Sequence, residues 1–126
     1  MKPRDIEPGK WEDAKVQARE AMTSAARSAK GMITYSDLIT KITALPLAPD
    51  SMALRELLGD ISREEDQTGH GMLSVVVVHK EGNDRGRPGN GFFILAQELG
   101  RDTRDREKFW ISEFAKVQAF CKRARS

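Results

Sequence analysis

The sequence contains a single cysteine, two histidines and one tyrosine among 126 residues. One cysteine cannot form a disulfide within the chain, and two histidines with one thiol are too few for a zinc site built from these ligands. We therefore expect no metal site and no cofactor. A lone thiol also favours a reducing, cytoplasmic location.

Long apolar stretches and a strong charge of one sign are missing as well. No apolar run approaches the roughly 20 residues of a membrane span, and the N-terminus lacks the apolar core of a signal peptide. We expect a soluble, unprocessed protein with no membrane partner. The net charge of +2, from 21 basic and 19 acidic residues, is too small to predict nucleic-acid binding by itself.

Apolar residues recur at helical spacing near both ends of the chain. The first stripe consists of Trp11, Ala14, Ala18, Ala21, Met22, Ala25 and Ala29. It predicts a helix over residues 10–30, ending near Gly31. The second consists of Trp110, Phe114, Val117 and Cys121 and predicts a helix from about Asp105 to Arg123. Because the first stripe is mostly alanine, we expect this helix to pack against the bulkier C-terminal one.

Two further helices are expected between these ends. Thr34 and Asp37 have the Thr-x-x-acid order of an N-terminal capping arrangement, which predicts a short second helix. Pro46 and Pro49 prevent its continuation. Asp50 or Ser51 can then cap a third helix. The apolar stripe of that third helix is Leu54, Leu57, Leu58 and Ile61.

The segment after the third helix predicts a β-hairpin. Met72–Val78 is rich in β-branched residues and leaves neither face polar, as in a buried strand. Residues 81–90 have loop chemistry, and Gly91–Phe93 is expected to return as the second strand. The stretch Ile94–Leu99 either completes that strand or forms a short helix ended by Gly100, and we favour the helix.

Together these elements predict a single α+β domain over residues 1–126. Its core, residues 31–93, is expected to be a winged helix-turn-helix with a two-stranded hairpin, residues 81–90 forming the wing. The N-terminal helix (10–30) and the C-terminal helical segment (94–126) pack around this core.

The opening of that core resembles a known DNA-binding domain. The stretch Gly-Met-Ile-Thr-Tyr-Ser-Asp-Leu, residues 31–38, resembles the start of the winged-helix domain of alkylguanine transferases and alkyltransferase-like proteins. Residues 57–59 and 73–82 fall in comparable order, so the resemblance covers residues 31–93, about half of the chain. It implies a DNA-binding winged helix. The transferases carry Pro-Cys-His-Arg where this chain has Met72–Val75, and the only thiol, Cys121, lies on the apolar stripe of the last helix. Alkyl transfer needs an activated thiolate, so transferase activity is not expected.

In a winged helix, DNA contacts come from the third helix and the wing. The candidate nucleic-acid contacts are therefore Ser51 and Arg55 on the third helix and Arg85 and Arg87 on the wing. Two arginines on a glycine-rich tip can reach a groove or a phosphate, although such a tip can also be a solvated turn. The basic segment from Arg104 onward either complements a helix C-terminus or contacts a polyanion.

The charge of the third helix supports an alternative. Residues 52–66 carry two basic and five acidic side chains, a net charge of −3, which opposes phosphate. The alternative is a protein-interaction or dimerisation domain that uses this acidic helix and binds no nucleic acid. A hydrolase built on Glu64, Glu65, Asp66 and His70 ranks last, because no nucleophile–base pair is visible. The sequence thus predicts a non-enzymatic binding module, DNA-binding in the leading interpretation, without naming its ligand, DNA sequence preference, oligomeric state or pathway.

Overall fold

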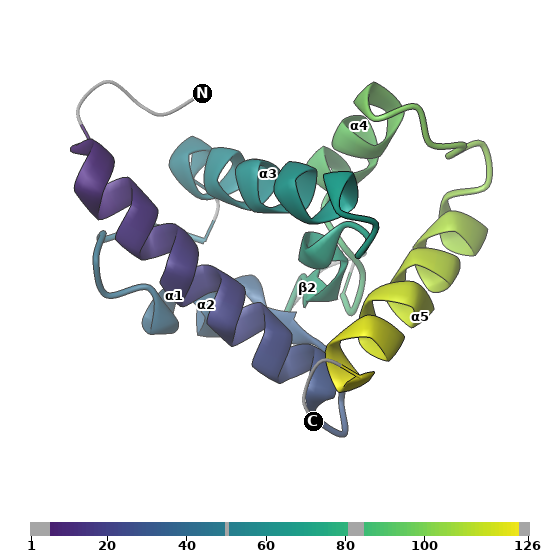
Figure 1. The fold of residues 1–126 in the computed structure, drawn as a ribbon, viewed down its shortest axis with the longest axis horizontal. Coiled ribbons are helices and arrows are strands. Elements are labelled where there is room, and N and C mark those ends of the chain that lie inside the picture. The colour runs from purple at the N-terminus through teal and green to yellow at the C-terminus, as the bar shows by residue number, and fades with distance from the viewer. Residues whose placement is uncertain (1–5, 50, 81–84, 124–126) are drawn as a thin grey trace.

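The fold is known from a computed structural model that describes residues 6–49, 51–80 and 85–123. In these residues the chain is a mixed α+β protein with five α-helices, one 3-10 helix and a two-stranded parallel sheet. The elements are α1 (Pro8–Arg27), β1 (Ile33–Thr34), α2 (Tyr35–Lys41), α3 (Met52–Gln67), the 3-10 helix η1 (Leu73–Val76), β2 (Val77–Val78), α4 (Asn90–Glu98) and α5 (Arg106–Arg123). Figure 1 shows α1 and α5 converging at the C-terminal end of α5, with α3 lying across the space between them.

The two terminal helices pack as the sequence predicts. The indole of Trp11 is fully buried at the start of α1. At the other end of α1, the Nε of Arg27 donates a hydrogen bond to the carbonyl of Cys121 in α5, at 2.9 Å. Gly31 follows with a positive φ of 73°, and a Cβ atom there would lie 3.0 Å from Cζ of Phe114. Only glycine combines that backbone with so close an approach of α5.

Both expected capping residues occupy their predicted places. The Oγ1 of Thr34 accepts a hydrogen bond from the backbone N–H of Asp37, at 3.1 Å, at the start of α2. The Oγ of Ser51 accepts one from the N–H of Leu54, at 3.2 Å, at the start of α3. Asp50, the other capping candidate, lies outside the described residues. The apolar stripe of α3 is buried, as expected from its spacing.

The buried strand predicted over Met72–Val78 is only partly correct. All seven residues are buried, but Leu73–Val76 forms the 3-10 helix η1 and only Val77–Val78 is extended. The backbone N–H of Met72 donates to the Glu113 carboxylate at 2.8 Å, and that of Ser74 donates to the Ser62 hydroxyl at 3.0 Å. Since side chains of distant helices satisfy these donors, this part of the segment needs no neighbouring strand.

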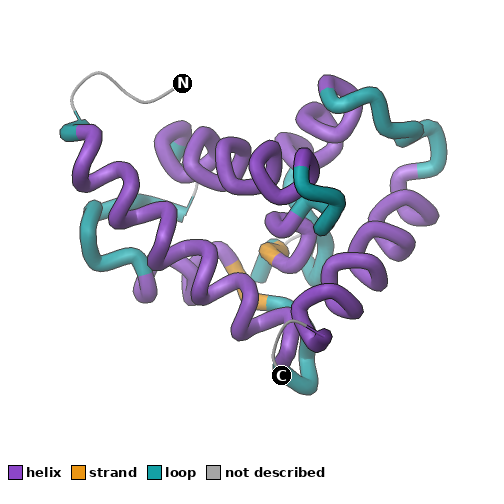
Figure 2. The backbone as a smooth tube through the Cα atoms, viewed as in Figure 1, coloured by secondary structure: helices purple, strands orange, loops and turns teal. Residues whose placement is uncertain are grey.

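The predicted hairpin is wrong. Strand β2 pairs in parallel with β1, placing Ile33 beside Val77 and Thr34 beside Val78, and Figure 2 shows the two short strands near the middle of the molecule. Gly91–Phe93 belongs to α4, not to a return strand. The buried residues of α4 are Phe92, Phe93, Leu95 and Ala96. They have helical spacing, which the prediction of a strand over Gly91–Phe93 did not take into account.

The short helix favoured over Ile94–Leu99 is confirmed as the later part of α4. Gly100 ends it with a φ of 79° and donates its N–H to the carbonyl of Gln97 at 3.0 Å. Within the described part of the chain, no helix has the length and apolarity needed to cross a bilayer.

Candidate functional site

A cavity of about 740 Å³ opens between α3, α4, the start of α2 and the residues after β2. This volume lies within the range of small-molecule sites in proteins, about 300–1,000 Å³. Its apolar wall includes Leu58, Phe92 and Leu95, each at most 7% exposed.

The two ends of the cavity differ. At one end Arg55 of α3 lies beside Gly91 of α4, where a Cβ atom would be 3.8 Å from the arginine Cδ. Two helical turns further along, Arg63 of α3 donates to the Glu98 carboxylate of α4 at 3.3 Å. Both helices therefore run from the Arg55 end of the cavity toward the Arg63–Glu98 ion pair.

Tyr35, His79 and Gly89 form a corner of the Arg55 end. The rings of Tyr35 and His79 lie 5.1 Å apart between centroids, and the tyrosine hydroxyl accepts a hydrogen bond from the Gly89 N–H at 3.1 Å. A Cβ at Gly89 would lie 2.9 Å from that hydroxyl and 3.3 Å from the imidazole Nε2. Burial raises the pKa of Tyr35 above its usual value, although the Gly89 N–H and the Arg55 charge oppose the rise. The phenol is therefore neutral at pH 7.

The N-terminus of α4 lies at the same end of the cavity. Gly89 is its N-cap and supplies no side-chain hydrogen bond to the first turn, while Asn90 and Gly91 line the cavity. The first N–H groups of a helix carry a partial positive charge. Arg55 and Lys80 also line the cavity, as does Glu56, whose Oε2 is buried without a hydrogen-bond partner in the structure.

The four predicted nucleic-acid contacts do not lie together. Arg55 is exposed at the cavity, and Arg85 is exposed on the segment whose backbone pairs with His79. Arg87 instead donates to the Glu107 carboxylate of α5 at 2.7 Å, with its guanidinium carbon 5.7 Å from the centre of the Trp110 ring. Ser51 caps α3 and lines a separate cavity beside α1.

Two backbone hydrogen bonds close the base of the segment that was predicted to be the wing. The N–H of His79 donates to the Arg87 carbonyl at 3.0 Å, and the N–H of Gly86 donates to the His79 carbonyl at 2.9 Å. The tip, residues 81–84, lies outside the described residues. Lys122 and Arg123 end α5, and no described residue of α5 lines the cavity.

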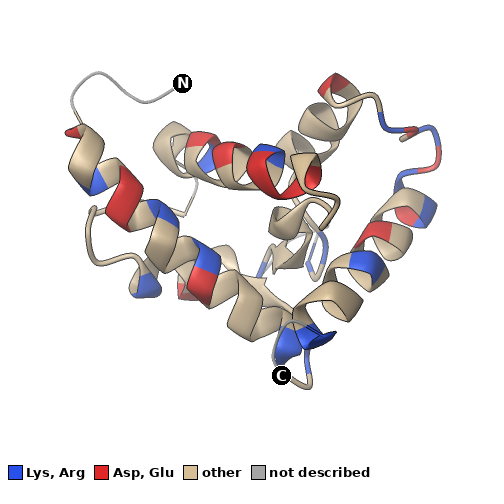
Figure 3. Ribbon diagram, viewed as in Figure 1, with Lys and Arg blue, Asp and Glu red and all other residues tan. Residues whose placement is uncertain are grey.

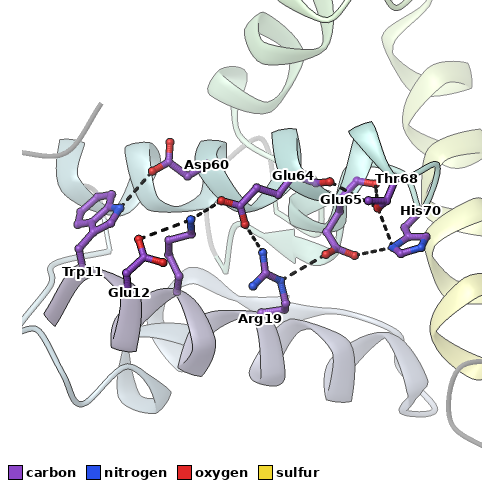
Figure 4. A network of polar contacts seen from close by, with 9 residues as sticks. Trp11, Glu12, Arg19, Asp60, Glu64, Glu65, Thr68 and His70 are labelled. Carbon is purple, nitrogen blue, oxygen red and sulfur yellow. Dashed lines mark hydrogen bonds and ion pairs between the residues drawn. The ribbon is translucent and has the colours of Figure 1, made fainter. Parts of the chain in front are cut away.

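Figure 3 marks the acidic residues of α3 in red, and Figure 4 shows the contacts that Asp60, Glu64 and Glu65 make within the chain. Asp60 accepts a hydrogen bond from the Trp11 indole at 3.1 Å. Glu64 pairs with Lys15 and, at 2.5 Å, with Arg19 of α1. Burial would raise the pKa of Glu64, but hydrogen bonds from these two cations outweigh it and leave the pKa below its usual range.

The other members of the Glu64–His70 cluster also have partners within the chain. Glu65 lies 3.3 Å from Arg19 and 3.0 Å from Nδ1 of His70, whose ring stacks on Phe120 at 3.7 Å. Asp66 accepts from Arg101 at 2.7 Å. Among the described residues, no group of three acidic, histidine or cysteine side chains is arranged to hold a metal ion.

Tyr35, His79 and the start of α4 were not identified as site residues from the sequence. Tyr35 lies in the sequence only within the capping motif of residues 34–37, and His79 only directly after the predicted strand Met72–Val78. The usable signal was Pro-Gly-Asn-Gly before residues with helical spacing, which is typical of an N-terminus without a side-chain cap. Comparisons of the chain with protein-family models, curated proteins and solved structures gave no match.

Proposed function

We propose that the chain is a non-enzymatic DNA-binding module of helix-turn-helix type, with the mouth of the α3–α4 cavity as its contact surface. The observation that carries the proposal is the exposed Arg55 on α3, beside the N-terminus of α4, which has no side-chain cap. A helix N-terminus and a neighbouring guanidinium are both groups that bind phosphate.

The order of the elements supports this arrangement. Helix α2, a proline-containing turn and α3 follow one another as in a helix-turn-helix. The segment after β2 brings Lys80 to the cavity and exposes Arg85, so it takes the place of a wing. Backbone N–H groups, Lys and Arg at such positions fix the register of a protein on a duplex.

The acidic character of α3 opposes this proposal less than its net charge of −3 indicates. Its carboxylates at 60, 64, 65 and 66 contact Trp11, Lys15, Arg19, His70 and Arg101. Glu56 is the acidic residue of α3 that lines the cavity. Paired carboxylates repel phosphate less than unpaired ones, because the neighbouring cation cancels most of their field.

Fluorescence anisotropy with a labelled random-sequence duplex at low salt tests the proposal. We expect micromolar affinity that falls as salt is added, because phosphate contacts release counterions. Arg55→Ala is expected to weaken binding about fivefold. Arg104→Ala is the matched control, since it removes the same charge from the segment between α4 and α5, where Arg104 pairs with Asp102.

Two results would reject this assignment: no salt-sensitive binding at micromolar protein, or equal losses in Arg55→Ala and Arg104→Ala. The first result, together with a dimer or a captured partner in native lysate, would favour the protein-interaction alternative. That alternative depends on the negative charge of α3. Ion pairs of Glu64, Glu65 and Asp66 with cations of the same chain neutralise much of this charge. The proposal places the protein in the cytoplasm, where its single, buried thiol would remain reduced.

A further inference from the structure

The cavity between α3 and α4 contains a hydrogen-bond acceptor that the protein leaves unsatisfied. Glu56 of α3 lines the cavity, and its Oε2 is buried from solvent without a hydrogen-bond partner in the structure. Every other carboxylate of α3 has a partner within the chain, namely Asp60, Glu64, Glu65 and Asp66. A buried acceptor without a donor costs free energy. Glu56 is therefore the carboxylate of this helix whose role the fold does not explain.

We propose that this cavity binds a small aromatic molecule whose polar group is an N–H donor of the amidine or amide type, and that Glu56 accepts its hydrogen bond. The terminal torsion of a glutamate side chain has a broad energy minimum, so the carboxylate can turn toward the ligand while α3 stays in place. The inference is separate from DNA binding, because it concerns the interior of the cavity and requires a donor rather than a phosphate.

The walls of the cavity suit the aromatic body of such a ligand. Leu58, Phe92 and Leu95 line it and are each at most 7% exposed. Its volume of about 740 Å³ and its mixture of apolar walls with a few polar groups are typical of small-molecule sites. A ring placed between α3 and α4 therefore gains free energy by leaving water, while its polar group remains free to contact Glu56.

The other charges of the lining leave Glu56 as the acceptor for this group. Glu98, the second acidic residue of the lining, already accepts from Arg63 at 3.3 Å. Arg55 and Arg63 both interact within the chain, and Lys80 belongs to a different wall, after β2. A carboxylate binds an amidinium as it binds a guanidinium, through charge-assisted N–H···O bonds in one plane. We therefore expect an amidine to bind more tightly than a neutral amide.

Three naphthalene derivatives of the same shape test the proposal on the whole chain by isothermal titration calorimetry. The probes are 2-naphthamidine, 2-naphthamide and 2-naphthoate, which carry a cationic donor, a neutral donor and an anion without a donor. We expect affinity to fall in that order, with the amidine at least about tenfold tighter than the naphthoate. Lack of saturable amidine binding, or a naphthoate that binds as tightly as the amidine, would overturn the proposal.

A pair of matched variants assigns the acceptor. Glu56→Gln should weaken amidine binding about tenfold, because a charge-assisted hydrogen bond becomes a neutral one, and should leave naphthoate binding no weaker. Glu98→Gln removes the same charge from the same cavity, at a carboxylate that Arg63 already occupies, and should leave amidine binding within about twofold. Equal losses of amidine binding in the two variants would overturn the assignment to Glu56.

A second pair of variants tests whether the ligand lies inside the cavity. An added Cβ at Gly91, which lines the cavity from α4, would meet only the Cδ of Arg55, at 3.8 Å, so a leucine fits the fold and takes up part of the cavity. Gly91→Leu should abolish amidine binding, whereas Gly9→Leu, on α1 where nothing lies within 4 Å of an added Cβ, should not change it. Near-ultraviolet circular dichroism establishes that each variant is folded. Unchanged amidine binding by a folded Gly91→Leu variant would overturn the site.

Duplex DNA, titrated into the same preparation of the wild type, separates this inference from the proposed function. Amidine binding without DNA binding would support the cavity site and reject the proposed function. DNA binding without amidine binding would support the proposed function and reject the cavity ligand.

Discussion

Glu113 is the acidic side chain that the core depends on most. It is 2% exposed on α5, accepts the backbone N–H of Met72 at 2.8 Å and pairs with Arg101. Arg101 in turn pairs with Asp66 of α3. A carboxylate buried this deeply is stable only when cations and N–H donors surround it. Glu113 therefore connects α5, η1 and, through Arg101, α3.

Glu113→Ala is expected to lower the free energy of unfolding by about 3 kcal/mol, because it leaves the Met72 N–H and the Arg101 guanidinium without their acceptor. The matched control is Glu107→Ala on the same helix, whose side chain is 56% exposed in its pair with Arg87 and whose loss should cost less than about 0.5 kcal/mol. Urea denaturation measures both. Similar losses in the two variants would contradict the role of Glu113.

At the scale of elements, α3 determines where the cavity lies. One side of the helix faces α1 through Asp60 and Glu64, and another faces α4 through Arg55 and Arg63. Its first turn starts at Ser51, whose hydroxyl bonds to the backbone of Leu54. This cap fixes the start of the helix one turn before Arg55.

Ser51→Ala is expected to destabilise the protein by about 1 kcal/mol, since an orphan N–H of α3 loses its acceptor. Ser51→Asn should stay within a few tenths of a kcal/mol of wild type, because asparagine is an equally good N-cap. Ser112→Ala removes a hydroxyl from the exposed face of α5 and serves as the control. Thermal unfolding of the three variants would refute the capping role if Ser51→Asn were as unstable as Ser51→Ala.

For the whole molecule, ion pairs connect helices that are far apart in the sequence. Figure 4 shows Arg19 of α1 between Glu64 and Glu65 of α3, and Glu65 beside His70. The ring of His70 in turn stacks on Phe120 of α5. The α1–α3–α5 assembly therefore combines an apolar core with a chain of charged contacts at its surface. The contribution of these ion pairs to the free energy of unfolding therefore depends on pH.

The Glu64 contacts are expected to weaken in acid. Because Lys15 and Arg19 lower its pKa in the folded state below the usual 4.5, its contribution is complete above about pH 4.5 and is lost as the pH falls through the folded-state pKa. Glu64→Gln should therefore melt below wild type at about pH 6, and the gap should narrow as the pH falls below the usual pKa of 4.5 and close once Glu64 is protonated in the folded state. Glu20→Gln, at an exposed position of α1, should show no such closing gap. A gap for Glu64→Gln that persists in acid would contradict the ion-pair assignment.

Local signals in the sequence determined most of the helical framework. Helical spacing placed α1, α3 and α5, and the hydroxyls of Thr34 and Ser51 marked two helix starts, because caps and stripes depend on residues within a few positions of one another. The same information identified Arg55, since an arginine near the start of a capped helix is readable from the chain alone.

Only the tertiary structure decided the shape of the segment after α3 and the site beside it. Leu73–Val76 forms a 3-10 helix because Ser62 and Glu113, 12 and 41 positions from the groups they bind, satisfy backbone donors that a strand partner would otherwise take. The corner formed by Tyr35, His79 and Gly89 joins residues up to 54 positions apart. Such contacts have no local signature, since they exist only after α1, α3 and α5 have enclosed the segment.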